Sequence, residues 1–112
     1  MPKYNKLVRD HIPDLIKITG KNPVVRTLGE EEYAAALRRK LREETSEYIK
    51  ADNNRDAVKE LADVLEVVHA LASLQGITTE ELEDVRANKE KERGGFHDRV
   101  YLVEVNNEAQ VK

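Results

Sequence analysis

The sequence contains no cysteine and no tryptophan, and only 4% of its residues are aromatic. Without cysteine the chain has no disulfide, no thiolate metal site and no cysteine nucleophile, which suits a reducing cytoplasm. With so few aromatic rings, a core must be built mainly from aliphatic side chains. Long apolar runs are also missing. None approaches the ~20 residues that a membrane-crossing helix needs, and the N-terminus has no apolar signal region.

Charge is abundant but nearly balanced. Asp, Glu, Lys and Arg make up 37% of the 112 residues, and the net charge is −3 with the two signs interspersed. This distribution argues against a nucleic-acid binder that relies on a broad basic surface. The length predicts one domain spanning residues 1–112, and small helical domains with this much charge often complete their core by self-association. We therefore expect a cytoplasmic homodimer or homotetramer with neither a nucleic-acid nor a membrane partner.

Apolar periodicity and turn residues predict a mainly helical fold. A short helix is expected near residues 10–20, followed by long helices over about 30–50 and 55–75 and a fourth helix over about 79–92. The two long helices are joined by the short turn Asp52-Asn53-Asn54 and should form an antiparallel pair. Two runs rich in β-branched residues, 23–28 and 100–105, are predicted to pair as a small two-stranded β element beside the helices.

Four acids stand out on the long helices: Glu44 and Glu47 on the first, Glu60 and Asp63 on the second. The i, i+3 spacing places the two members of each couple on one helix face. At about 100° per residue, Glu44 and Glu60 fall inside the apolar arcs, Glu47 and Asp63 fall on their borders, and Glu43 faces away. An acid among core residues is costly unless it is paired or holds a cation. Packing the two helices together would gather oxygen ligands suited to Mg²⁺ or Mn²⁺.

Two simpler interpretations remain open beside this one. In a chain with so much charge, Glu-x-x-Glu on a helix is also the ordinary pattern of a solvated surface. Lys89 and Arg93, four residues apart on the fourth helix, can reach one anion from the same side, but cations are favoured near a helix C-terminus in any case. Taken together, an acid-held cation and these two basic residues describe a site for a polyphosphate.

Three motifs resemble those of a known superfamily. Glu43-Glu44-Thr45-Ser46-Glu47 followed by Glu60-Leu61-Ala62-Asp63 is similar to the paired acidic signature of the all-α nucleotide pyrophosphohydrolases. These include the MazG-like proteins, the phosphoribosyl-ATP pyrophosphohydrolases and the dimeric dUTPases. The opening Tyr4-Asn5-Lys6-Leu7-Val8-Arg9-Asp10-His11-Ile12-Pro13 and the closing Lys89-x-x-x-Arg93-Gly94-Gly95-Phe96 resemble a small single-domain branch related to the MazG-like and phosphoribosyl-ATP enzymes.

The resemblance implies a MazG-like helical bundle assembled as a dimer or tetramer. It also implies Mg²⁺-dependent attack of water on the α-phosphate of a canonical or non-canonical nucleoside triphosphate, which yields a monophosphate and pyrophosphate, as expected of a house-cleaning enzyme. Carried over by position, the metal-binding and catalytic residues would be Glu44, Glu47, Glu60 and Asp63. The phosphate-binding residues would be Lys89, Arg93 and Asn88. Glu43 would have a supporting role, and Lys6 and Arg9 would be contributors without an assigned place.

Three alternatives are kept. One is phosphoribosyl-ATP as the substrate. Another is a non-catalytic helical module for nucleotide binding, regulation or protein interaction, in which the acids would form interface salt bridges to Arg38, Arg39 and Arg42 of a second subunit. The third is a nucleotide sensor that binds metal and nucleotide without turnover.

Overall fold

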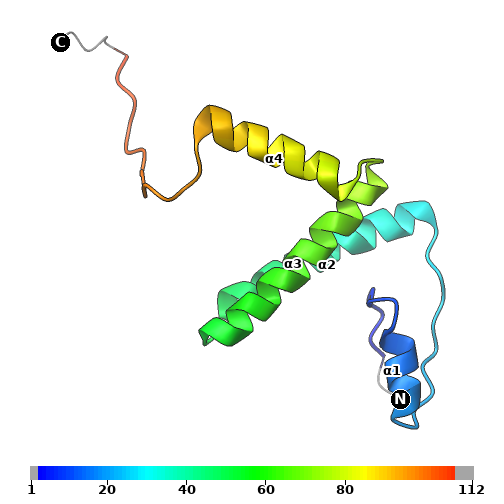
Figure 1. Ribbon diagram of the computed structural model, residues 1–112. Coiled ribbons are helices and arrows are strands. Elements are labelled where there is room, and N and C mark those ends of the chain that lie inside the picture. Colours follow the sequence, from blue (N-terminus) through cyan, green and yellow to red (C-terminus); the bar gives the residue numbers. More distant parts are fainter. Residues whose placement is uncertain (1–2, 108–112) are drawn as a thin grey trace. The chain divides into compact units, whose positions relative to one another are not determined.

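The structure is a computed structural model that describes residues 3–107. It contains four helices, α1 (Ile12–Ile18), α2 (Glu30–Lys50), α3 (Asn54–Leu74) and α4 (Thr79–Arg93), shown in Figure 1. Each boundary lies within two residues of the one predicted from the sequence. The chain divides into two units, one ending at Thr79 and the other beginning at Glu80. The prediction of a single domain stays a prediction.

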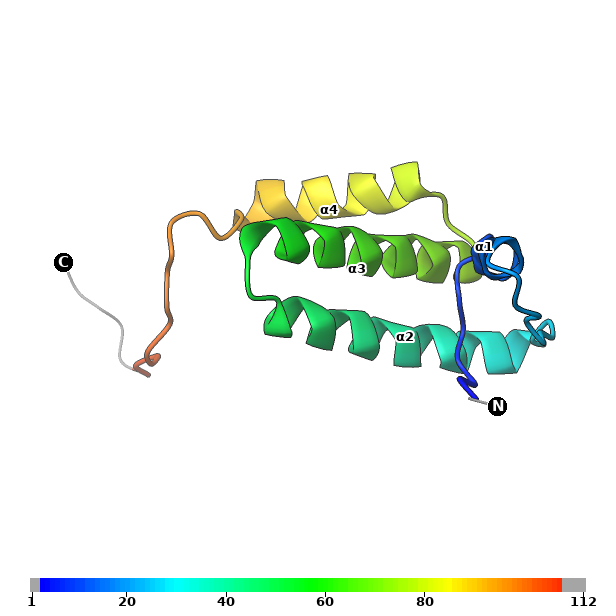
Figure 2. The same ribbon diagram turned by 90° about the horizontal axis from the view of Figure 1, so that it is seen from below.

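Helices α2 and α3 form an antiparallel pair and lie side by side along their lengths (Figure 2). Three acids in the first turn of α2 favour its start, because negative charge is stabilised at the positive end of a helix. After a short loop, Asn53 caps α3. Its side-chain oxygen accepts a hydrogen bond from the Asp56 backbone N–H at 2.8 Å, and its amide donates to the Asp56 carboxylate at 3.0 Å. These contacts fix the point at which the chain turns back.

The core between α2 and α3 is small. Its buried apolar residues are Ala36, Leu37, Val67 and Ala72, of which Leu37 is the most enclosed, with 3% of its surface exposed. A second apolar row on α3 stays open to solvent and consists of Val58, Leu61 and Leu65, each about half exposed. These three residues follow i, i+3, i+7 and therefore share one face of the helix. Helix α3 thus carries more apolar surface than α2 covers.

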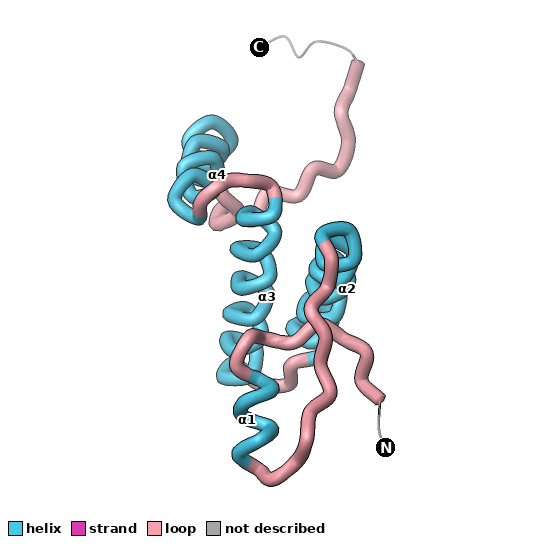
Figure 3. The backbone as a smooth tube through the Cα atoms, turned by 90° about the vertical axis from the view of Figure 1, so that its right-hand side faces the viewer, coloured by secondary structure: helices cyan, strands magenta, loops and turns pink. Residues whose placement is uncertain are grey.

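The predicted two-stranded β element is wrong. Figure 3 shows helices and loops but no strand within residues 3–107. The runs 23–28 and 100–105 are loop segments whose residues are mostly exposed, with 92% of Val24 and 88% of Tyr101 accessible. Strand propensity reflects how side chains fit a partly buried sheet, so β-branched residues alone do not form a strand without neighbours.

The unit that begins at Glu80 contains most of α4 and the loop residues after it. The predicted stop at the glycine pair is confirmed, because Gly94 has a φ of 82° and its N–H donates to the Glu90 carbonyl at 2.7 Å. Across residues 3–107, no single helix is both long and apolar enough to cross a bilayer; α3 and α4 joined as a bent pair meet the criteria of length and composition alone.

Candidate metal centre

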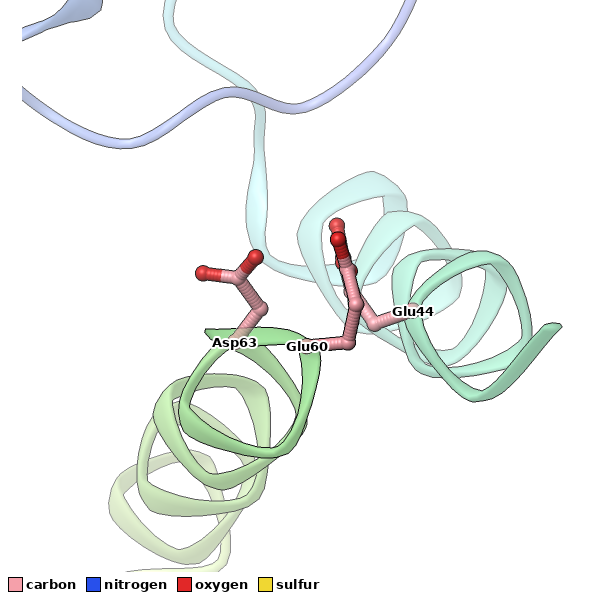
Figure 4. Close-up of side chains that lie close together, drawn as sticks. All are labelled: Glu44, Glu60 and Asp63. Carbon is pink, nitrogen blue, oxygen red and sulfur yellow. The ribbon is translucent and has the colours of Figure 1, made fainter. Parts of the chain in front are cut away.

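Three carboxylates meet across the α2–α3 pair. Glu44 comes from α2, and Glu60 and Asp63 come from α3; one oxygen from each lies within 4.8 Å of the other two. Figure 4 shows the three carboxyl groups projecting toward the same side of the two helices. The i, i+3 spacing brings Glu60 and Asp63 onto one face of α3, and the antiparallel packing places Glu44 beside them. We call these three residues the acid triad.

The acid triad is partly enclosed by protein. All three residues are intermediate in burial, and the Glu44 side chain is only 15% exposed. Loss of solvent raises the pKa of Glu60, and the negative charges of Asp63, Glu44 and Glu47 raise it further, as does a hydrogen bond with Glu44. Like charges held close together favour the protonated form of one of them. The triad therefore carries more negative charge than its protein neighbours balance.

Among residues 3–107, two cations contact the acid triad. Lys40 lies one turn before Glu44 on α2, and its Nζ is 3.5 Å from a Glu44 oxygen and 3.6 Å from a Glu43 oxygen. The Lys40 side chain is only 19% exposed. Its i, i+4 spacing to Glu44 was the signal that could have identified the pair. The second cation is Arg9, whose Nη2 is 2.6 Å from Asp63 Oδ1.

Glu47 lies outside the acid triad. It was predicted to lie on the border of the apolar arc and to be a fourth metal-binding residue. Its side chain is exposed, and its negative charge contributes to the raised pKa of Glu60. Glu47 and Glu60 also line a shallow, open depression of about 180 Å³ at the end of the helix pair. The other residues that line it are Lys50, Ala51, Asp52 and Asp56. Four of the lining residues are acidic and one, Lys50, is basic, so the depression adds negative charge next to the triad.

The chemistry of the donor set fits a hard divalent cation. The triad offers three carboxylate oxygens from two helices, and ligands of this kind suit Mg²⁺, Mn²⁺ and Ca²⁺. Loss of solvent and then the nearby negative charges raise the pKa of Glu60, and a bound cation would offset the contribution of the charges. The triad could therefore hold a divalent metal ion.

The predicted phosphate-binding residues Asn88, Lys89 and Arg93 lie on α4, in the second unit, and all three are exposed. Within the described part of the chain, no salt bridge engages Lys89 or Arg93. Arg86, on the same helix, contacts Glu83 at 2.6 Å and Glu90 at 3.5 Å. Among the basic residues of α4, Arg86 already has acidic partners, while no salt bridge is formed by Lys89, Lys91 or Arg93 within the described residues.

Comparison with known proteins gives one family and one curated relative. The model of the family described as phosphoribosyl-ATP pyrophosphohydrolase matches residues 21–90, which include all four predicted acids. An uncharacterized protein of Mycolicibacterium smegmatis is 53% identical over 55 residues, or 49% of this chain and 55% of that protein. The chain thus spans about half the length of the curated relative it matches. No solved structure matches the chain.

Proposed function

Because this chain belongs to the phosphoribosyl-ATP pyrophosphohydrolase family, we propose that it is a divalent-metal-dependent nucleoside triphosphate pyrophosphohydrolase. The substrates are nucleoside or deoxynucleoside triphosphates, including non-canonical ones. Water attacks the α-phosphate, the bond between the α- and β-phosphates breaks, and the products are a nucleoside monophosphate and pyrophosphate. The enzyme acts in the cytoplasm.

In this proposal the acid triad holds Mg²⁺, with Mn²⁺ as a substitute, and Glu47 is the fourth carboxylate of the site. Held there, a divalent cation would supply neutralisation of phosphate charge and activation of the attacking water. Lys89 and Arg93 bind the polyphosphate through charge-assisted hydrogen bonds, and the Asn88 amide provides a neutral donor. Lys40 fixes the rotamer of Glu44 by pairing with it from the preceding turn.

One observation carries the proposal: carboxylates from two helices converge within 4.8 Å without enough cations to balance them. Such an arrangement is unfavourable in the metal-free protein, as the raised pKa of Glu60 indicates. Groups whose pKa is perturbed by like charges at a partly enclosed site are concentrated at functional centres. A cation is the ligand that would relieve the repulsion.

The test is a panel of canonical and non-canonical nucleoside triphosphates incubated with the purified chain and Mg²⁺. We expect equimolar pyrophosphate and monophosphate from at least one nucleotide, and no product when EDTA replaces Mg²⁺. Release of orthophosphate instead of pyrophosphate would indicate a different bond and contradict the proposal. Tight nucleotide binding without any product over hours would favour a sensor, and the absence of both would favour an interaction module.

Phosphoribosyl-ATP is a second candidate substrate, which the description of the matching family supports. It contains the same α–β phosphoanhydride bond, so the proposed site and reaction are unchanged. The same assay with phosphoribosyl-ATP in the panel separates the two candidates. A kcat/KM for phosphoribosyl-ATP more than about tenfold above that for every triphosphate would make it the substrate.

We propose further that the open row Val58, Leu61 and Leu65 on α3 packs against a second copy of the chain. The support is physical: these residues are about half exposed, and the core between α2 and α3 contains few buried side chains. Light scattering coupled to gel filtration should report a dimer or tetramer. Leu65→Glu should shift the protein toward the monomer, whereas Val85→Glu, on α4, should leave the assembly intact. A monomeric wild-type protein would contradict this part of the proposal.

A further inference from the structure

Arg9 joins a distant part of the chain to the acid triad. It lies 54 positions before Asp63 in the sequence, yet its Nη2 donates a 2.6 Å hydrogen bond to Asp63 Oδ1. Figure 4 shows the N-terminal segment, in blue, running past the side on which the three carboxyl groups project. The sequence motif had included Arg9 without giving it a role. The contact places it at the metal-binding edge of the site.

The backbone around Arg9 is held while its side chain remains accessible. Leu7 and Val8 are half-buried, and the Arg9 carbonyl accepts the Ile12 N–H at 3.1 Å just before α1 begins. The guanidinium itself lies at the surface, with 54% of the side chain exposed, and Asp63 is 38% exposed. A long, flexible side chain on a fixed backbone can exchange one anionic partner for another without refolding the segment.

While Arg9 is paired with Asp63, the Oδ1 atom of that carboxylate is not open to a metal ion. A cation held by the triad would compete with the guanidinium for the same carboxylate and repel it as a like charge. Lys40 differs in this respect, because its Nζ is also 3.6 Å from Glu43, an acid outside the triad with which it can stay paired. Arg9 is therefore the cation that metal binding would displace.

We propose that Arg9 is a phosphate-binding residue that Asp63 holds in the metal-free protein and releases when metal enters. The freed guanidinium then binds phosphate oxygens of the substrate, which suit its planar, bidentate arrangement of donors. This inference rests on the proposed function, since it concerns the polyphosphate at the same site. The binding of the two ligands is therefore linked. Metal alone has to displace Arg9 from Asp63, whereas metal bound together with a polyphosphate provides Arg9 with a new anionic partner.

The first measurement uses metal alone. Mn²⁺ binding to wild type and to Arg9→Gln is followed by electron paramagnetic resonance of the free ion. Removing the competing guanidinium should tighten Mn²⁺ binding by about two- to fivefold, the range expected for an exposed ion pair. Circular dichroism checks that the variant is folded. Arg26→Gln is the matched control, because Arg26 forms an exposed ion pair with Glu32 at 2.9 Å that does not involve the triad.

The second measurement adds a polyphosphate without a base. Binding of inorganic tripolyphosphate in the presence of Mg²⁺ is measured by calorimetry, so that the unknown base preference has no influence. Arg9→Gln should weaken this binding by about tenfold, the loss expected for a charge-assisted contact. Arg9→Lys keeps the charge but not the bidentate fork and should show both effects at smaller size. Arg26→Gln should show neither.

The two changes of opposite sign distinguish the proposal from a structural role. A variant that only disturbs the fold would weaken metal and tripolyphosphate binding together, and that result would overturn the proposal. So would Mn²⁺ binding that is not tightened, tripolyphosphate binding that is not weakened, or a wild-type protein that does not bind tripolyphosphate. None of these readouts requires turnover. The failure of the nucleotide assay and the failure of the Arg9 proposal can therefore be recognised separately.

Discussion

The protein contains two groups of acidic side chains that differ in what surrounds them. In the acid triad, Glu60 has three other acids near it, and its pKa is raised. On α4, Glu83 contacts the guanidinium of Arg86, chiefly through a hydrogen bond, and its pKa is lowered. Arg86 in turn also reaches Glu90, at 3.5 Å. In the first group the like charges still raise the pKa of an acid although Arg9 and Lys40 are nearby, while in the second group Arg86 lies between its two acids.

This contrast indicates which group of acids a bound cation would stabilise. The α4 group is an ordinary exposed network of i, i+3 and i, i+4 pairs that stabilises its own helix. The acid triad joins two helices that are distant in sequence and brings their negative charges together, which costs stability unless something binds there. The number of acidic residues does not distinguish the two groups. They differ in the direction of the pKa shift, and in whether the neighbouring charges come from the same helix or from another one.

The largest expected effect comes from breaking the acid triad. Glu60→Gln should lower kcat/KM for pyrophosphate release by at least about 100-fold, because even partners outside the ligand shell commonly change metal affinity or activity by 10–100-fold. Mn²⁺ affinity should fall in parallel. Glu83→Gln is the matched control on the balanced group and should keep wild-type activity. If Glu60→Gln retained more than a tenth of the activity, the triad would not be the metal site.

A smaller effect is expected from the unpaired cations of α4. Lys89→Ala and Arg93→Ala should each raise KM by about tenfold, as expected for a lost charge-assisted hydrogen bond to phosphate, with a smaller change in kcat. Arg86→Ala is the control, because its guanidinium is already engaged by Glu83 and Glu90. Steady-state kinetics on the best substrate measures all three. Equal effects of all three substitutions would show only a general loss of positive charge.

The raised pKa of Glu60 also predicts how stability depends on pH. The folded, metal-free protein binds this proton more tightly than the unfolded chain does. The stabilising contribution is therefore present below the ordinary glutamate pKa of about 4.3 and is lost as the pH rises through the folded-state value. Glu60→Gln removes both the charge and the titration. In urea denaturation with EDTA, the variant should gain stability over wild type as the pH rises.

A bound metal ion should make wild type more stable than Glu60→Gln, the reverse of the order expected in EDTA. At a concentration 100 times its dissociation constant, a cation that binds only the folded state stabilises it by about 2.7 kcal/mol. Wild type should show this gain with Mn²⁺, and Glu60→Gln should show much less. A stability difference in EDTA that narrows with rising pH would contradict the repulsion inferred at the triad.

The helices were predictable because each one satisfies its own backbone hydrogen bonds. The period of the apolar residues, the Asn53 cap and the stop at Gly94 all act locally, and each can be read from neighbouring residues. The strand-like runs near Val24 and Val103 carried an equally clear local pattern. A strand needs a hydrogen-bonding neighbour, however, and the sequence does not say whether one is present. The β element was wrong for that reason.

The same distinction applies to the acids. The helical positions of Glu44, Glu60 and Asp63 marked them as unusual, because they lie within or beside the apolar arcs. The approach of Arg9 to Asp63 could not be predicted, since it depends on the path of a loop-rich segment 54 positions away. The i, i+4 spacing is compatible with the Lys40–Glu44 contact. The sequence does not show which of the neighbouring cations Arg38, Arg39, Lys40 and Arg42 pairs with an acid of the site.

The smallest effect should come from the balanced group on α4. The pKa of Glu83 is lowered, so its pairing with Arg86 contributes stability above the unfolded pKa, and this contribution is lost as the pH falls through the folded value. Both side chains are more than half exposed, so water and salt screen the interaction. Glu83→Gln should therefore lower the melting temperature by no more than a degree or so at neutral pH. Circular dichroism melts in low and high salt measure it. The prediction is contradicted if Glu83→Gln lowers the melting temperature as much as substitution of Glu60 changes it. It is also contradicted if high salt does not reduce the loss.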